Sequence, residues 1–286
     1  MNDGDAVLAE AVTACREALG PRLVAAYALG SLAHGGFSPL VSDVDLGLIL
    51  ADPLGESDEG MIQTVADTVR AGGSALHERL SLFWGTPATL QGQVSGGRFP
   101  PLDRLDLLEN GRLLAGNDAR HGLARPSYDE LLVAGAEFAL EFLGGQRVLG
   151  RGSAGLSSMS PADDTVLEEL RAPTLLVSRG PRHLTKIVLF PVRFLFTAAT
   201  GQVGTSAAAA DYYLASSHAP ATELVAAALG WRLAPPEDKD AAAALLDREL
   251  VPLYLHYVHD HAARLLVVGR SDLAERFEEW RDRLLD

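Results

Sequence analysis

The chain of 286 residues carries a formal net charge of −14 at pH 7, and 48% of its residues are hydrophobic. That length and composition suit one large or two ordinary globular domains, and the acidic balance disfavours binding to nucleic acid, which depends on clustered Lys and Arg. With the single cysteine Cys15 no intramolecular disulfide is possible, and the start of the chain lacks the basic segment of a signal peptide. The longest apolar stretch, residues 187–200, is too short for a membrane span and is interrupted by Pro191 and Arg193. We therefore expect a cytoplasmic protein without a membrane partner.

The first 125 residues mix predicted helices and strands. The spacing of apolar residues predicts a helix over residues 5–19, which Pro21 ends, and a second helix at Ser57–Ala71. Apolar runs predict strands at Leu23–Leu29, Val44–Leu50, Leu80–Trp84, Thr89–Val94 and Arg104–Leu108. We expect an α/β domain over residues 1–125, built on a small mixed sheet with helices.

Beyond Pro126 the pattern becomes helical. Helices are predicted at Tyr128–Leu143, Pro161–Arg171, His183–Thr200, Ser206–Ser217, Ala221–Leu229, Lys239–Leu250, Pro252–Val268 and Ser271–Leu285. Pro191 is expected to kink the third of these, and the Gly/Ser-rich stretch Gly144–Ser160 is expected to be flexible. Residues 126–286 are therefore expected to form an all-α helical bundle that binds substrate or nucleotide.

The most informative motif lies between the first two predicted strands. It consists of Gly30-Ser31, eleven further residues, and Asp43-Val44-Asp45. Residues i and i+2 of a strand share a face, so Asp43 and Asp45 are expected to point the same way. Two adjacent carboxylates repel each other unless a cation lies between them, and hard oxygen ligands suit Mg²⁺. The Gly-Ser turn offers backbone N–H groups and a hydroxyl that can hold phosphate oxygens.

This pattern resembles the active-site hairpin of the nucleotidyltransferase superfamily. The resemblance implies that Asp43 and Asp45 bind two Mg²⁺ ions that hold ATP or another nucleoside triphosphate. It also implies that Gly30, Ser31 and Ser42 contact the nucleotide. A glycine turn followed by an acidic strand edge with no function is the alternative interpretation.

Members of the superfamily usually carry a third acid on a nearby strand. Asp106 is our candidate, because it stands between apolar neighbours in the predicted strand Arg104–Leu108, where an unpaired carboxylate is costly to bury. It is expected to complete the metal site or to act as general base for an acceptor hydroxyl. The other acids considered for this position are Glu78, Asp103 and Glu109.

Two further segments resemble the streptomycin/spectinomycin adenylyltransferases. The first is Gly97-Arg98-Phe99-Pro100-Pro101 with the acid that follows it, and the second runs from His183 to Gly201. That family has a glutamate as the acid, whereas this chain has an aspartate that is one methylene shorter. The family also carries a lysine after the second segment that contacts phosphate, and residues 201–208 contain none. Lys186 or Arg193 is expected to reach the triphosphate instead; a solvated lysine and a structural ion pair are the alternatives.

The resemblance implies a Mg²⁺-dependent enzyme that moves a nucleotidyl group from a nucleoside triphosphate to a hydroxyl of a small acceptor. The expected group is AMP, with ATP as the donor. An aminoglycoside or aminocyclitol is the expected acceptor class, and an acidic protein suits a cationic amino sugar. Antibiotic resistance is the associated role, and a monomer or small homo-oligomer is expected. Two other hypotheses stay open: a nucleotidyltransferase that modifies a protein, as antitoxins do, and a nucleotide-binding sensor without catalysis.

Overall fold

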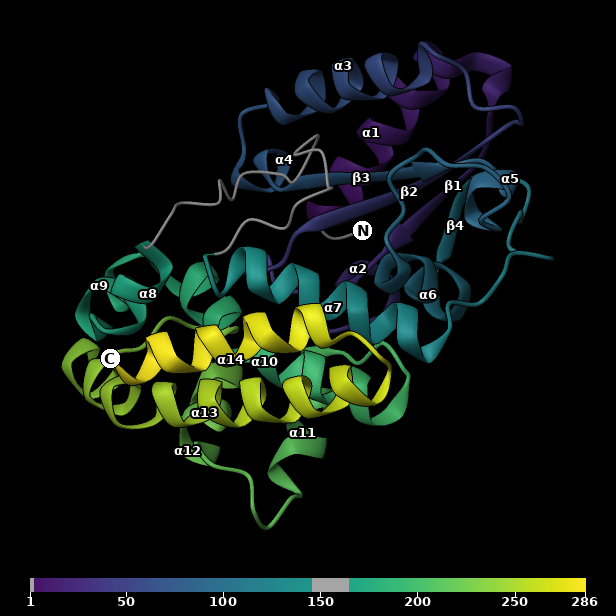
Figure 1. The fold of residues 1–286 in the computed structure, drawn as a ribbon. Helices are drawn as coiled ribbons and strands as arrows, with labels where there is room; N and C mark the ends of the chain where they lie inside the picture. Colours follow the sequence, from purple (N-terminus) through teal and green to yellow (C-terminus); the bar gives the residue numbers. More distant parts are fainter. Residues whose placement is uncertain (1–2, 146–164) are drawn as a thin grey trace. The chain divides into compact units, whose positions relative to one another are not determined.

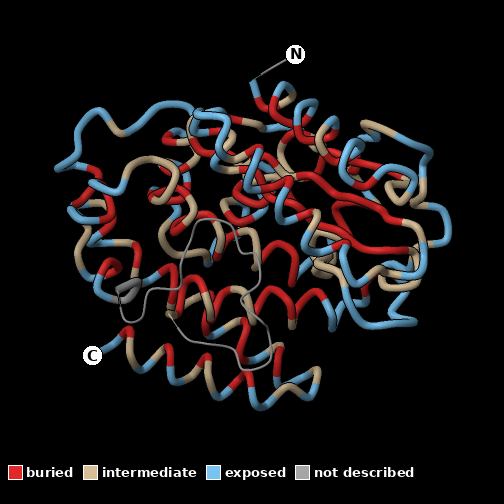
Figure 2. Tube along the Cα trace, turned by 90° about the horizontal axis from the view of Figure 1, so that it is seen from above, coloured by how far each residue is buried: buried red, intermediate tan, exposed pale blue. Residues whose placement is uncertain are grey.

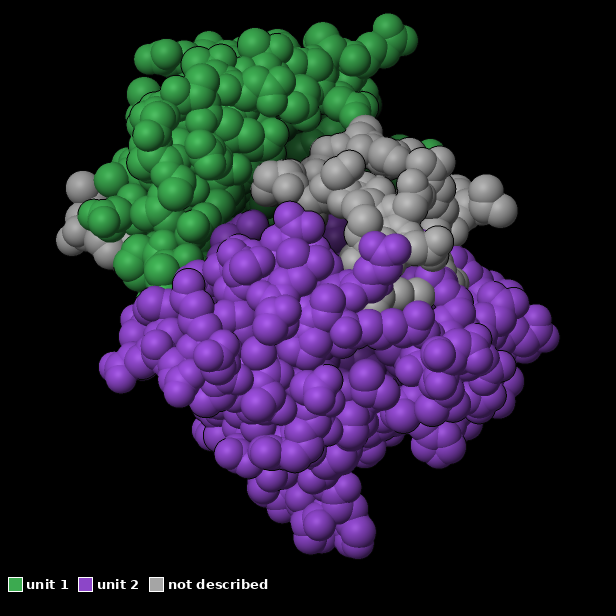
Figure 3. Space-filling view, turned by 90° about the vertical axis from the view of Figure 1, so that its left-hand side faces the viewer, with its two compact units in different colours: residues 1–126, 155–158 green, residues 127–154, 159–286 purple. Residues whose placement is uncertain are grey.

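The computed structural model describes residues 3–145 and 165–286. These residues form two compact units that divide between Pro126 and Ser127 (Figure 3), and each unit has its own hydrophobic core. Most of the stretch Gly144–Ser160, expected to be flexible, lies outside the described residues. Among the helices described, none is both long and apolar enough to cross a membrane.

The first unit is built on a four-stranded sheet with the order β3-β2-β1-β4 (Figure 1). Its strands are β1 Leu23–Leu29, β2 Val44–Leu50, β3 Leu80–Gly85 and β4 Arg112–Gly116. β1 is antiparallel to β2 and to β4, whereas β2 and β3 are parallel. The small mixed sheet is therefore confirmed, and the two strands that flank the glycine–aspartate motif have the predicted bounds.

Helices cover both faces of this sheet (Figure 1). The helical segments of the unit are α1 Asp3–Leu19, the 3₁₀ turn Gly20–Arg22, α2 Ser31–His34, α3 Asp58–Arg70, α4 Ala75–Glu78, α5 Pro87–Leu90 and α6 Pro101–Asn110. The apolar stripes of α1 and α3 pack on one face, and Leu90 of α5 and Leu107 of α6 pack on the other. Figure 2 shows buried and exposed residues alternating along the helices, as amphipathic packing requires.

The predicted strand Arg104–Leu108 is wrong, because these residues belong to helix α6. Leu105 and Leu107 are both buried, so the short segment satisfies a strand period as well as a helical one. Pro101 at the first helical position and Asp103 in the first turn are the helix-start signals that decide the matter. Asp106 therefore reaches the site from a helix and not from the sheet.

The predicted strand Thr89–Val94 is also wrong. Its first residues complete the short helix α5, which begins with a capping box between Thr86 and Thr89, and Pro87 occupies the first turn. Gly92 has a φ of 71° and ends this segment in a turn. The capping side chains satisfy the backbone N–H groups locally, so the segment does not join the sheet.

The second unit is entirely helical in its described part, which confirms the predicted helical bundle. Its helices are α7 Tyr128–Phe142, α8 Thr165–Leu170, α9 Pro173–Ser178, α10 Pro181–Thr200, α11 Ser206–Leu214, α12 Thr222–Trp231, α13 Lys239–Val267 and α14 Ser271–Leu285. α7 begins with a capping box between Ser127 and Glu130. Apolar residues from α7 to α14 form the core of this unit.

Helix α10 continues through Pro191 because another helix repairs the backbone. A proline has no N–H, so the carbonyl four residues earlier, that of Ile187, loses its helical donor. The hydroxyl of Tyr254 on α13 donates to this oxygen at 2.9 Å. Tyr254 is fully buried, and without its hydroxyl the carbonyl would lack this donor.

Helix α13 runs unbroken from Lys239 to Val267, although two helices were predicted on either side of Pro252. Pro252 is exposed, while Leu250 and Leu253 beside it are buried in the core. A proline on the solvent side of a helix leaves the freed carbonyl accessible to water, so the buried stripe holds the helix together. The division of this segment into two helices was therefore wrong.

Candidate functional site

Gly30 and Asp45 lie against each other at one end of the sheet. β1 ends at Leu29, which pairs with Asp45 of β2, and Gly30 caps the start of α2. Gly30 has a φ of 58° and a ψ of −148°, a conformation that residues with a side chain rarely adopt. A Cβ at this position would lie 2.5 Å from Oδ2 of Asp45. The carboxylate thus occupies the space that only a glycine leaves open.

Asp43 directly precedes β2 and shares a face with Asp45. Val44 between them is fully buried, whereas both aspartates are half-buried. This alternation of burial is what a shared face for the two carboxylates requires. It is the face that carries Leu29 and Ile49 and on which α6 packs.

Asp106 of α6 reaches the same turn and supports its backbone. Its Oδ2 accepts a hydrogen bond from the N–H of Gly30 at 2.6 Å, and its Oδ1 accepts one from Nδ2 of Asn110 at 2.9 Å. The side chain is buried. A short hydrogen bond from an N–H to a carboxylate is of the strong, charge-assisted kind. Gly30 is therefore held by two acids, one at its N–H and one over its Cα.

Ser31 and Ser42 occupy different surroundings. Ser31 is half-buried at the first position of α2. Ser42 is buried in the loop before Asp43, where its hydroxyl accepts a hydrogen bond from the N–H of Ser38 at 3.0 Å. Its contacts indicate that Ser42 shapes the loop that delivers Asp43 to β2.

Lys186 and Arg193 lie on one face of α10, two helical turns apart. The Nζ of Lys186 lies 5.8 Å from the ring centroid of Phe190, and the Cζ of Arg193 lies 5.9 Å from it. Burial lowers the pKa of Arg232, and the positive charge of Arg193 lowers it further. Both basic side chains therefore lie beside the ring of Phe190.

Asp43 and Asp45 offer carboxylate oxygens, the kind of ligand that Mg²⁺ takes in proteins. In residues 3–145 and 165–286, no three or more His, Cys, Asp or Glu side chains are grouped so that they could hold a metal ion. Asp106 thus does not complete a three-carboxylate cluster with Asp43 and Asp45. Mg²⁺ is commonly held by one or two carboxylates, with substrate phosphates and water filling the remaining positions.

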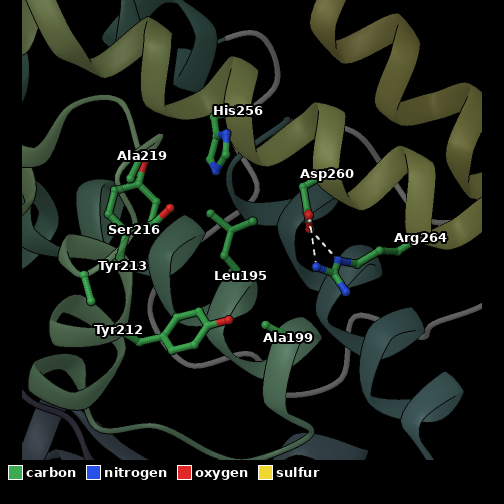
Figure 4. A pocket seen from close by; sticks show the side chains of 10 residues that line it. Leu195, Ala199, Tyr212, Tyr213, Ser216, Ala219, His256, Asp260 and Arg264 are labelled. Carbon is green, nitrogen blue, oxygen red and sulfur yellow. Dashed lines mark hydrogen bonds and ion pairs between the residues drawn. The ribbon is translucent and has the colours of Figure 1, made fainter.

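The second unit contains a cavity of about 400 Å³ between α10, α11 and α13 (Figure 4). Leu195 and Tyr212 contribute apolar and aromatic walls. Asp260 and Arg264 form an ion pair at one end of the cavity, where the Nε of Arg264 lies 2.7 Å from Oδ2 of Asp260. Burial lowers the pKa of His256, although the charge of Asp260 opposes the shift. The acid and the arginine that line the cavity are paired with each other.

Two residues of the site were not singled out from the sequence. Asn110 holds the far oxygen of Asp106, one helical turn along α6. Arg98 places its guanidinium over the ring of Phe83, with Cζ 5.1 Å from the ring centroid. The hydrogen bond between Asn110 and Asp106 has a sequence signal, the spacing of four residues on a helix, but only if α6 is recognised as a helix.

Comparison with solved structures finds this fold in spectinomycin adenyltransferase AAD(9) from Enterococcus faecialis, whose crystal structure contains ATP and spectinomycin. The two proteins share 15% sequence identity with a TM-score of 0.52, over 86% of this chain and 98% of that chain. No family model matches the chain, and no curated protein sequence does. The chain therefore has the nucleotidyltransferase fold, a small mixed sheet with helices followed by a helical unit.

Proposed function

We propose that this chain is an enzyme that transfers a nucleotidyl group from a nucleoside triphosphate, AMP where ATP is the donor, to a hydroxyl of a small molecule. One arrangement carries the proposal: the carboxylate of Asp45 lies against the Gly30 turn, with Asp43 on the same face. The likeness of the fold to an adenyltransferase crystallised with ATP and spectinomycin supports both substrate classes.

In the proposed reaction the acceptor hydroxyl oxygen attacks the α-phosphorus in line, and the bond from the α-phosphorus to the bridging oxygen breaks to release pyrophosphate. The hydroxyl proton passes to water. Asp43 and Asp45 would hold Mg²⁺, which when bound neutralises the triphosphate and stabilises negative charge on the α-phosphate. The Gly30-Ser31 turn would orient the nucleotide, and Lys186 and Arg193 are the proposed further cations. Positioning and charge stabilisation are the main contributions that proteins make to phosphoryl transfer.

We assign Asp106 a positioning role in preference to that of general base. Both of its carboxylate oxygens accept hydrogen bonds, one from the Gly30 N–H and one from Asn110. A general base must lie within hydrogen-bond reach of the proton it takes, and these two bonds hold the carboxylate toward the turn and Asn110. If Asp106 orients the turn, its loss should lower the rate without changing the dependence of the rate on pH.

The net charge of the protein favours one class of acceptor but does not define it. The net charge of −14 attracts cations, which favours an aminocyclitol or aminoglycoside. The cavity of the second unit does not contribute to this preference, because Asp260 is already paired with Arg264. An acceptor screen should therefore include neutral polyols beside amino sugars.

Pyrophosphate release and calorimetric titration with ATP, each with and without Mg²⁺, test the proposal on the wild type and on Asp43→Asn and Asp45→Asn. We expect Mg²⁺-dependent binding of ATP that both variants lose while their melting temperatures stay near that of the wild type. Asp67→Asn is the matched control, because Asp67 is an exposed carboxylate on α3 of the same unit. Retained activity in Asp45→Asn would refute the proposed mechanism.

A nucleotide sensor without catalysis is the second candidate, and one observation favours it. Among the four described strands, Asp45 is the only acid, so no further carboxylate stands beside it on the sheet. Mg²⁺-dependent binding of ATP without pyrophosphate release, across a screen of amino sugars and polyols, would select the sensor over the enzyme.

A further inference from the structure

Arg98 is fixed beside the sheet by its own backbone. Its N–H donates to the carbonyl of Trp84 at 2.7 Å, and its carbonyl accepts from the N–H of Trp84 at 2.9 Å. Gly97 permits this approach, since a Cβ there would lie 2.7 Å from the oxygen of Trp84. The loop before α6 is thus joined to the end of β3, and the side chain of Arg98 begins from a defined position.

The guanidinium lies on the face of the sheet that carries Asp45. Phe83, over which it stacks, pairs in register with Gly47, and Gly47 is two residues beyond Asp45 on β2. Alternation along the strand puts Asp45 and Gly47 on one face. Burial lowers the pKa of the Arg98 guanidinium, and the charge of Arg70 adds to this shift, whereas the negative charges of Asp103 and Asp45 oppose it.

Most of the hydrogen-bonding capacity of this guanidinium is unused. Its Nη1 donates to the carbonyl of Leu82 at 2.6 Å. Arg98 makes no ion pair and no other side-chain hydrogen bond within residues 3–145 and 165–286. A guanidinium has five N–H donors in a rigid fork that matches the oxygens of a phosphate or a carboxylate. A half-buried guanidinium with idle donors is prepared for an anion that arrives from outside the protein.

We propose that Arg98 binds a phosphate group of the nucleoside triphosphate, as the cation of a phosphate subsite on the first unit. This inference rests on the proposed function. It also accounts for charge: a protein of net charge −14 that binds a polyanion needs a local cation, and residues 201–208 supply no lysine. The fork of Arg98 would hold a phosphate that is not transferred while the two aspartates hold the metal.

The competing explanation is that Arg98 only covers the edge of β3. Arg70 provides a matched control on the same strand: its Nε and Nη2 donate to the carbonyl of Leu80 at 3.0 and 2.9 Å, and its Nη1 pairs with Asp67 at 3.5 Å. Both arginines therefore bond carbonyls of the same strand, two residues apart. A purely structural role predicts that Arg98→Gln and Arg70→Gln behave alike.

The experiment measures melting temperature and the affinity for Mg²⁺-ATP and for Mg²⁺-tripolyphosphate in the wild type, Arg98→Gln, Arg98→Lys and Arg70→Gln. We expect Arg98→Gln to bind both ligands at least about tenfold more weakly, as the loss of a charged hydrogen bond implies. Arg98→Lys should be intermediate, since it keeps the charge but not the fork, and also serves if the Gln variant does not fold. Arg70→Gln should bind both ligands within about twofold of the wild type.

Equal affinity in Arg98→Gln and the wild type would overturn the inference, as would equal weakening in Arg70→Gln. Arg98-dependent binding of tripolyphosphate in a protein that transfers no nucleotidyl group would uphold the subsite and refute the enzyme. A wild type that binds neither ligand would refute both the subsite and the proposed function.

Discussion

Replacing Gly30 by alanine tests whether the glycine turn and the carboxylate of Asp45 form one site. The substitution has two separable effects. The backbone conformation, with φ 58° and ψ −148°, should cost an alanine about 2 kcal/mol of folding free energy. The new Cβ would lie 2.5 Å from Oδ2 of Asp45, so the carboxylate must move by about 1 Å to reach ordinary contact distance. A displacement of that size in a catalytic group lowers rates by roughly a hundredfold.

Gly35→Ala separates these effects. Gly35 lies in the same hairpin with φ 91° and ψ 173°, but nothing lies within 4 Å of a Cβ built there. Both variants should therefore melt lower than the wild type by about 8 °C, a shift that roughly 2 kcal/mol produces in a unit of this size. Only Gly30→Ala should also lose about a hundredfold in pyrophosphate release and in Mg²⁺-dependent affinity for ATP. Equal loss of activity in both variants, or full affinity in Gly30→Ala, would refute this account of the turn.

Three further predictions concern single side chains. Asp106→Asn should lower kcat/KM at least about tenfold with an unchanged pH–rate profile, because it weakens the charge-assisted bond to the turn; a change in the profile would restore the role of general base. His261 is buried, and burial lowers its pKa although the charge of Asp260 opposes the shift. As the pH falls, this histidine is therefore protonated in the unfolded chain before it is protonated in the folded one. The free energy of unfolding should fall below about pH 6.5, by up to about 1.4 kcal/mol per pH unit. Urea titrations from pH 8 to 5 should show the full loss in the exposed-site control His259→Gln and a smaller loss in His261→Phe, where only the lowered pKa of His256 still contributes. Tyr254→Phe should cost about 1–3 kcal/mol, because the carbonyl freed by the proline of α10 loses its donor, whereas Tyr257→Phe should cost almost nothing, because that buried hydroxyl has no partner in the described residues.

The part of the site that could be predicted from the sequence is the part encoded by neighbours in the chain. The apolar runs on each side of the glycine turn predicted β1 and β2, and the period of a strand predicted that Asp43 and Asp45 share a face. The bond from Gly30 to Asp106 joins residues 76 positions apart, and no local pattern indicates it. Asp106 was found for a correct reason, an acid among buried neighbours, but on the wrong element, because five residues do not distinguish a helix from a strand.

The role of Arg98 also could not be predicted from neighbouring residues in the sequence. The segment around it was noticed, but its meaning depends on the pairing with Trp84, which precedes α5 in the chain. The helix prediction around Pro252 failed because a proline rule takes no account of which side of the helix is solvated. In each case the missing information was tertiary, a contact or an exposure that the chain acquires only on folding.

The distribution of acids over the elements bears on how a proton would leave the acceptor. Asp43 and Asp45 lie on one face, and each oxygen of Asp106 accepts a hydrogen bond, one from the N–H of Gly30 and one from Asn110. The first unit therefore offers charge and orientation around the turn, and no strand acid beside Asp45 to serve as a base. Phosphoryl transfer tolerates this arrangement, because its transition state is commonly loose and the nucleophile needs alignment more than early deprotonation. In the proposed reaction, Arg98 and the two aspartates hold the triphosphate. This alignment should limit the rate more than removal of the acceptor proton does.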